Sequence, residues 1–257
     1  MDQALSLVGL GGFAAAALVT LLSAIVKGAV GFAMPMLMIS GLASFLDPRV
    51  ALAALILPTL AANLQQSFRQ GIKPAIEATA PLWRYVMVLL IVLVIVAQLI
   101  YAFPAAVLIF GLGAAIVVLA ALQLAGWRPA IPPHARNRTD VIAGALSGVM
   151  GGLSGVWGPV TVLYLAALNT PKSEAIKIQG VMYSAGAVVL TLAHLRSGIL
   201  NAATIPLSAF LVLPTLIGVW AGFQIQDRLD QARFRRWTLI VLVFAGLNLM
   251  RRGLLGL

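Results

Sequence analysis

The chain has 257 residues, of which 61% are hydrophobic and only 9% charged, and its mean hydropathy is +1.04. A soluble domain carries about 25% charged residues, so this composition excludes an ordinary soluble globular protein. The net charge of +10 does not indicate a nucleic-acid partner, because the basic residues lie in short loops between apolar segments, as the positive-inside rule expects. The absence of cysteine excludes disulfides, thiol redox chemistry and thiolate metal sites. We expect neither a metal nor a cofactor.

Apolar segments of about 20 residues follow one another along the chain. A helix that rises 1.5 Å per residue crosses the roughly 30 Å hydrocarbon core of a bilayer in about 20 residues. We therefore predict an all-α polytopic membrane protein, located as a multi-pass protein in the inner (plasma) membrane. The predicted segments are 4–26, 28–46, 50–68, 81–102, 104–126, 141–168, 174–195, 203–226 and 237–252.

Two of these apolar stretches are interrupted by glycine and proline. The interruptions read GAVGFAMP at Gly28–Pro35 and GLSGVWGP at Gly152–Pro159. Glycine occupies the first and fourth places and proline the last place of both, at an offset of 124 residues. A broken backbone in hydrocarbon costs several kcal/mol per unsatisfied group unless it is buried in protein or lines a cavity. Two such breaks at matching positions of two halves predict the substrate site of a transporter.

The basic residues predict the topology, because three basic loops should face the cytoplasm. Segments 174–195 and 203–226 supply the two crossings needed between the second and third loop. The segment 141–168 is therefore predicted to enter and return as a re-entrant hairpin of two half-helices. The turns that begin at Arg69 and Arg196 then lie on opposite sides, which makes the two halves an inverted repeat. Eight spans with parallel halves are the alternative. The three loops contain Arg69, Lys73 and Arg84; Arg128, Arg136 and Arg138; and Arg228, Arg233, Arg235 and Arg236.

The predicted organisation has two membrane repeats joined by a linker. Each repeat is expected to contain a broken helix hairpin followed by three transmembrane helices. The basic, proline-containing stretch 127–140 is predicted to be an extended linker. It separates an N-terminal repeat, 1–126, from a C-terminal repeat, 141–257.

This pattern resembles the TauE/SafE family of sulfite exporters over essentially the whole chain. The resemblance implies a secondary transporter of small sulfur oxyanions or organosulfonates. Members of the family usually carry denser glycine runs at the breaks, where this chain has Phe32-Ala-Met34 and Val156-Trp-Gly158. The size or class of the substrate can therefore differ from plain sulfite. The resemblance rests on Gly28, Gly31, Pro35, Gly144, Gly148, Gly152, Gly155, Gly158 and Pro159, and on the turns Leu46-Asp-Pro48, Leu168-Asn-Thr-Pro171, Arg69-Gln-Gly71 and Arg196-Ser-Gly198.

The positions of the acidic residues favour an anion as the substrate. All seven lie at segment ends or in loops, whereas a cation pump or proton relay usually places a carboxylate within a span. A helix N-terminus carries about half a positive charge and free N–H groups, which suit the oxygens of sulfite or a sulfonate. Proline is well tolerated in the first helical turn, so we expect half-helices to begin near Pro35 and Pro159.

The breaks themselves supply most of the predicted binding residues. Lys27 precedes the first break and could neutralise the anion, or it could be an interfacial lysine whose ammonium reaches the headgroups. Trp157 lies within the second break and could form an apolar wall against an organic tail, with an interfacial tryptophan as the alternative. The predicted substrate-binding residues are Lys27, Gly28, Gly31, Phe32, Ala33, Met34, Asn63, Gln66, Gly152, Ser154, Gly155, Val156, Trp157, Gly158, Gln179 and Tyr183.

The remaining members of that set lie in the spans that follow the breaks, or within the second break. Asn63 and Gln66 share one helical face, and Gln179 and Tyr183 share another, because residues three or four apart are neighbours on a helix. These side chains and Ser154 could hydrogen-bond the oxygens of the substrate. Hydrogen bonding between helices, which polar residues often provide in membranes, is the alternative.

We therefore predict a secondary transporter, and specifically an exporter, of small sulfur-containing anions such as sulfite or organosulfonates. It would work by alternating access and hold the anion at broken-helix N-termini near the bilayer midplane, with H+ or Na+ as the expected coupling ion. The chain has no GxxxxGK[ST] motif, which excludes ATP hydrolysis of that type, and we do not expect an enzyme. A channel-like anion facilitator and a membrane-embedded enzyme are the alternatives.

Overall fold

The computed structural model describes residues 2–69, 71–99, 104–127, 131–228 and 230–255. Every regular element within these residues is helical, which confirms the predicted all-α class. The elements, in chain order, are α1 (Asp2–Val30), α2 (Met34–Leu42), α3 (Pro48–Arg69), α4 (Ile72–Thr79), the 3-10 helix η1 (Ala80–Leu82), α5 (Trp83–Gln98), α6 (Ala105–Leu124), the 3-10 helix η3 (Pro133–Ala135), α7 (Arg136–Ser154), α8 (Gly158–Ala167), α9 (Lys172–Ser197), α10 (Ile205–Phe210), α11 (Val212–Gln226) and α12 (Gln231–Leu255).

Five helical stretches of the described residues are long and apolar enough to cross a membrane. Shorter apolar helices cover Phe110–Leu124 and Gly158–Ala167. Together they indicate a multi-pass membrane protein. The five stretches are Gly11–Val30, Pro48–Arg69, Lys73–Gln98, Glu174–Ser197 and Ile205–Gln226.

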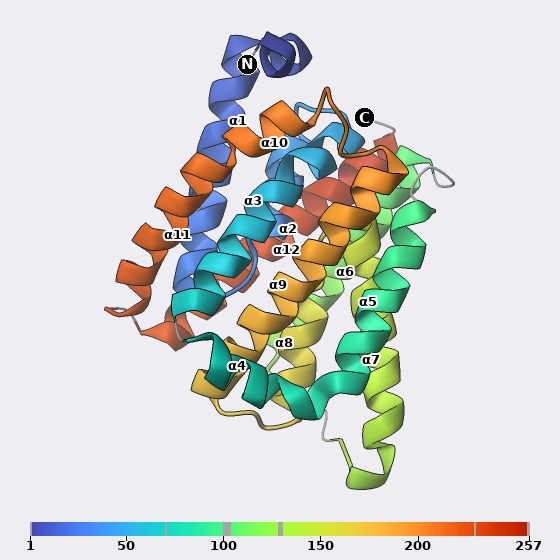
Figure 1. Cartoon of the computed structure of the whole chain (residues 1–257), viewed down its shortest axis with the longest axis vertical. Helices are drawn as coiled ribbons and strands as arrows, with labels where there is room; N and C mark the ends of the chain where they lie inside the picture. The colour runs from blue at the N-terminus through green and yellow to red at the C-terminus, as the bar shows by residue number, and fades with distance from the viewer. Residues whose placement is uncertain (1, 70, 100–103, 128–130, 229, 256–257) are drawn as a thin grey trace.

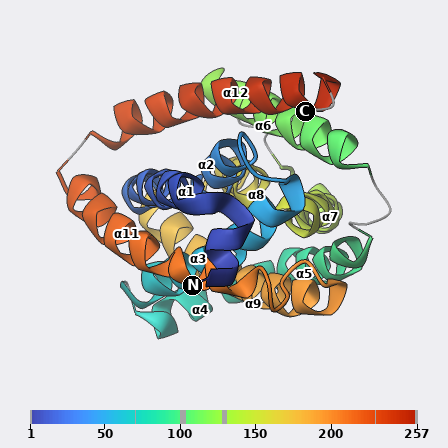
Figure 2. The same cartoon turned by 90° about the horizontal axis from the view of Figure 1, so that it is seen from above.

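The helices pack in pairs that combine the two halves of the chain. α1 packs against α11, α7 packs against α5, α3 packs against α9, and α6 packs against α12. Seen from above, α6 and α12 lie together along one side of the molecule, while the short helices α2 and α8 lie inside the bundle (Figure 2). The elements that begin just after the two breaks are therefore surrounded by longer helices.

Glycine permits the closest of these contacts. An ideal Cβ atom added to Gly28 would lie 2.3 Å from the carbonyl oxygen of Val219, and one added to Gly222 would lie 2.3 Å from that of Ile25. The stripe Gly144, Gly148 and Gly152 does the same for α7 against α5, with added Cβ atoms 2.7–2.8 Å from α5 carbonyl oxygens. In a membrane, where lipid is as apolar as a side chain, such backbone proximity is what holds helices together.

Both chain breaks lie within the predicted stretches, but the helix before the first break is longer than expected. α1 continues through Gly28 to Val30 instead of ending near residue 26. The turn falls where Gly31 has φ 86° and Ala33 has φ 84°, and the second turn contains Gly155 with φ 70°. As predicted, α2 and α8 begin around Pro35 and Pro159. α2 has 9 residues, which span about 14 Å at 1.5 Å each, so the segment predicted at 28–46 is too short a helix to cross the membrane.

The helices α3 and α9, which pack against each other, run in opposite directions (Figure 1). α3 runs down to α4 at the lower end of the bundle in Figure 1, and α9 runs up to α10 at the upper end. The same figure shows the C-terminal ends of α3 and α9 at opposite ends of the molecule. The predicted linker region also contains helix, because α7 begins at Arg136.

Candidate functional site

A small cavity lies between the two breaks. The two turns meet here, since a Cβ atom added to Gly158 would lie 3.6 Å from the Cβ atom of Phe32. Nine of the sixteen predicted binding residues line the cavity. The lining residues are Lys27, Phe32, Ala33, Pro35, Met36, Asn63, Gly155, Val156, Trp157, Gly158 and Tyr183.

Lys27, in the last turn of α1, is the basic side chain that lines the cavity. Its side chain is only 2% exposed, and its Nζ atom donates a hydrogen bond to Oε1 of Gln66 at 3.0 Å. The ammonium also lies 5.6 Å from the ring centroid of Tyr183, within range of a cation–π attraction. None of the ion pairs formed by the described residues includes Lys27. This burial differs from the headgroup position of a snorkelling lysine.

Asn63 and Tyr183 connect the cavity to α3 and α9. Nδ2 of Asn63 donates to the backbone oxygen of Tyr183 at 3.0 Å. The Tyr183 hydroxyl donates to the carbonyl oxygen of Gly158 at 3.3 Å. The Tyr183 ring also contacts Trp157, with ring centroids 6.4 Å apart. Residues from both halves therefore fix the shape of the cavity.

Two buried amides lie next to the cavity, beside Gly31. A Cβ atom added to Gly31 would lie 3.4 Å from Oε1 of Gln179 and 3.7 Å from Nε2 of Gln66. Neither amide atom has a hydrogen-bond partner among the described residues, and the two side chains are 6% and 5% exposed. A buried polar atom without a partner costs about 1–3 kcal/mol. These atoms are therefore available to a ligand or water.

Trp157 makes the second break different from the first. Its indole covers Gly151, where an added Cβ atom would lie 2.7 Å from Cε3, and Gly186, where it would lie 3.4 Å from Cε2. By the offset of 124 residues, Gly151 is the equivalent of Lys27. The N-terminal half therefore contributes a basic side chain at this position, and the C-terminal half contributes the aromatic surface of Trp157.

Seven predicted binding residues do not line the cavity. Gly28 and Gly152 face α11 and α5, where they permit close helix packing. Gly31, Gln66 and Gln179 lie in the adjacent amide cluster, and Met34 is fully buried at the start of α2. The seventh, Ser154, has a side chain outside the described set.

Two residues that line the cavity lie outside the predicted binding set. Pro35 was identified only as a helix start, and Met36 lies in the same first turn of α2. Extending each break into the first turn of the following helix would have included both. When the N-terminus of a helix points at a ligand, the residues of its first turn also face that ligand.

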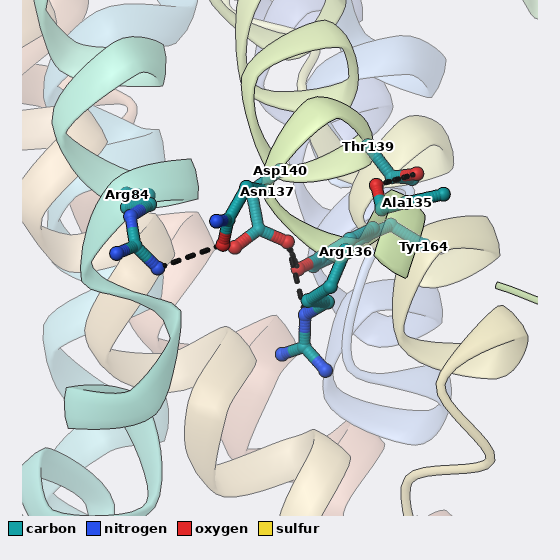
Figure 3. Close-up of polar contacts among 7 residues, drawn as sticks. All are labelled: Arg84, Ala135, Arg136, Asn137, Thr139, Asp140 and Tyr164. Carbon is teal, nitrogen blue, oxygen red and sulfur yellow. Dashed lines mark hydrogen bonds and ion pairs between the residues drawn. The ribbon is translucent and has the colours of Figure 1, made fainter. Parts of the chain in front are cut away.

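A second polar cluster fastens the hairpin of α7 and α8 at its open end (Figure 3). Nε of Arg136 lies 3.0 Å from Oδ1 of Asp140, and the hydroxyl of Tyr164 donates to the same oxygen. Nη1 of Arg84 donates to Oδ1 of Asn137 at 2.9 Å, which attaches the start of α7 to α5. Asp140 is 2% exposed, so this is a buried clamp between the first turn of α7 and the second half of α8.

A cluster of hydroxyl groups lies between this clamp and the cavity. The Tyr85 hydroxyl lies 2.6 Å from Oγ of Ser147 and 2.7 Å from Oγ1 of Thr161, and Thr161 donates to the carbonyl oxygen of Trp157 at 3.0 Å. The Tyr85 ring stacks on Tyr164 at 4.7 Å. Nothing in the local sequence around Tyr85 predicts this contact, which joins residues 62 and 76 positions apart.

Among the residues that the structure describes, no group of three or more histidine, cysteine, aspartate or glutamate side chains could hold a metal ion. The site instead offers the amino group of Lys27 and the free Nε2 donor of Gln66, which suit an anion, beside aromatic surfaces that suit an apolar group.

Comparison with known proteins identifies the family of the chain. No curated protein and no solved structure matches the chain. A family model described as "Sulfite exporter TauE/SafE" matches residues 16–249, which is nearly the whole chain. The chain therefore belongs to the TauE/SafE family of sulfite exporters.

Proposed function

We propose that this membrane transporter exports small sulfur-containing anions, such as sulfite or organosulfonates, and binds them in the cavity between the two breaks. The observation that carries the proposal is Lys27, a buried basic side chain without a carboxylate partner among the described residues. An unpaired ion in a low-dielectric interior costs several kcal/mol. A transported anion would provide the missing counter-charge.

Backbone N–H groups would complete the binding site. The first N–H groups of a helix have no intrahelical partner, and the helix dipole places partial positive charge beside them. α2 and α8 both begin at the cavity, and Ala33 and Gly158 at their starts are among its lining residues. The Lys27 ammonium and two helix N-termini would then surround a compact oxyanion, while Trp157 and Phe32 would contact an organic tail.

Alternating access would follow from an inverted repeat. The opposite directions of α3 and α9 support such a repeat (Figure 1). The helix pairing supports it as well, because α1 packs on α11 as α7 packs on α5, and α6 and α12 pack on each other. Two broken hairpins that enter from opposite sides would meet at the cavity, and rocking one repeat against the other would expose the anion to each side in turn.

Binding by the purified protein tests the proposal. The thermal stability of wild type and of the variant Lys27→Met is measured with sulfite, sulfate, thiosulfate, sulfoacetate, taurine and phosphate. At about 100 times its dissociation constant, a ligand stabilises by roughly 2.7 kcal/mol. We expect a selective shift with a sulfur anion in wild type and its loss in Lys27→Met.

The exposed residue Lys73 provides the matched control, because Lys73→Met makes the same chemical change outside the cavity. That variant should keep the full shift. An unchanged shift in Lys27→Met would show that the anion binds elsewhere. Counterflow in proteoliposomes, where anion inside accelerates labelled anion entering, is expected for alternating access and not for an open channel.

A further inference from the structure

We propose that Lys27 takes up a proton when the anion binds, so that the chain moves one proton together with each anion. This inference rests on the proposed function, because it concerns the same cavity. It assigns H+ as the coupling ion and Lys27 as the group that carries it. For a monoanion, the transported pair has no net charge.

The argument starts from the surroundings of the amine. Lys27 is 2% exposed, and Gln66 is the acceptor of its Nζ hydrogen bond. That acceptor is a neutral amide oxygen, which can accept from an amine as well as from an ammonium. The hydrogen bond therefore does not require the charged form.

The titratable and charged groups around Lys27 are few among the described residues. From α9, Tyr183 presents its ring, and its hydroxyl donates to Gly158. At the end of α3, Arg69 is already paired with Asp227 at the end of α11 at 2.9 Å, and it stacks on Phe223. The cavity-lining residues of α2 and α8 are uncharged. None of these groups supplies a negative charge to Lys27.

The empty cavity and the occupied cavity therefore favour different forms of the same side chain. A buried amine avoids the cost of an unpaired charge by releasing its proton. A bound anion within a few ångströms reverses that preference, because attraction between opposite charges is strong in a low-dielectric site. Proton and anion each raise the affinity for the other, as linkage requires.

The proton balance of the cycle is simple. The neutral amine accepts one proton from water, an N–H bond forms, and the anion binds beside the ammonium. After the site opens to the other side, the anion leaves and the amine returns the proton to water. The anion itself is not chemically changed, and no other reactant is needed.

Proteoliposomes that contain the purified protein and the trapped pH dye pyranine test this. The first probe is methanesulfonate, a strong-acid monoanion that cannot carry the proton itself. Thiosulfate and the anion that gives the largest thermal shift are measured alongside it. The membrane potential is clamped by valinomycin and K+. We expect the entry of methanesulfonate to acidify the lumen by one proton per anion. The rate of methanesulfonate entry should not change with the value of the clamped potential.

The variant Lys27→Arg distinguishes a carried proton from a fixed charge. A guanidinium remains charged at all accessible pH values, so this variant should bind the anion without taking up a proton, and its transport should become sensitive to the potential. In wild type, the apparent dissociation constant should rise by up to tenfold per pH unit in the alkaline range, because one proton is bound per anion. In Lys27→Arg it should stay flat. Lys73→Arg, outside the cavity, should behave as wild type.

The outcomes separate this inference from the function on which it rests. Wild-type transport that generates current without lumenal acidification would overturn proton coupling and leave anion transport intact. A pH dependence that is the same in wild type and Lys27→Arg would also overturn it. If no anion binds or crosses at all, the proposed function fails, and the inference fails with it.

Discussion

Replacing Gly28 by alanine should destabilise the protein through the contact of α1 with α11. The added Cβ atom would lie 2.3 Å from the oxygen of Val219 and 2.8 Å from Cα of Gly222. Both are backbone atoms and cannot rotate away. Since carbon contacts are most favourable near 3.5–4.0 Å, the two helices would have to separate by about 1 Å. Overpacking of this kind typically costs about 1–3 kcal/mol.

A matched control lies in the same helix. A Cβ atom added to Gly11 has no neighbour within 4 Å. Glycine to alanine in a helix gains about 1 kcal/mol from propensity, and this gain is common to both variants. The difference between Gly28→Ala and Gly11→Ala therefore isolates the packing cost, which we expect to be about 1–3 kcal/mol.

The measurement is the free energy of unfolding in mixed detergent micelles as the denaturing detergent is increased. Anion affinity is measured on the folded fraction of each variant, because Gly28 was predicted to bind the substrate and the structure shows it against α11. We expect the dissociation constant of Gly28→Ala to stay within about threefold of wild type, since such a change is under 1 kcal/mol. Equal unfolding free energies for the two variants would refute the packing argument. If Gly28→Ala has normal stability but no longer binds the anion, the prediction that Gly28 contacts the anion would be supported instead.

Two further substitutions test the second hairpin. Gly155→Leu should abolish the anion-induced thermal shift and transport. The backbone angle φ of 70° at this position is unfavourable for a residue with a side chain by about 1–2 kcal/mol, and the new Cβ atom would lie 2.9 Å from Leu55. Normal counterflow in this variant would contradict a site at the break. Asp140→Ala should lower the free energy of unfolding by about 1–3 kcal/mol, because the buried acceptor of the Tyr164 hydroxyl is lost. If Asp140→Ala unfolds at the same detergent concentration as wild type, the clamp between the start of α7 and the end of α8 does not stabilise the protein.

Local chemistry explains how much of the fold followed from sequence. Glycine and proline act on their own backbone, so the breaks before Pro35 and Pro159 could be located within a few residues. The positions of the long helices could be predicted from segment length and hydropathy, which are also local properties of the sequence. The predicted end of the first helix near residue 26 was wrong, because Gly28 continues the helix to Val30 and permits the close approach of Gly222.

The sequence by itself determined the class of protein and the two breaks, and nine of the sixteen residues that it predicted for binding line one cavity. Only the tertiary structure decided which face of each helix points inward. In a membrane the outer face of a helix is as apolar as its inner face, so periodicity does not identify the buried side. Contacts between distant parts of the chain depend on which helices meet, and they leave no local pattern in the sequence. Examples are the hydrogen bond of the buried Lys27 to Gln66 across 39 positions, the indole of Trp157 over Gly151 and the packing of Gly152 on α5.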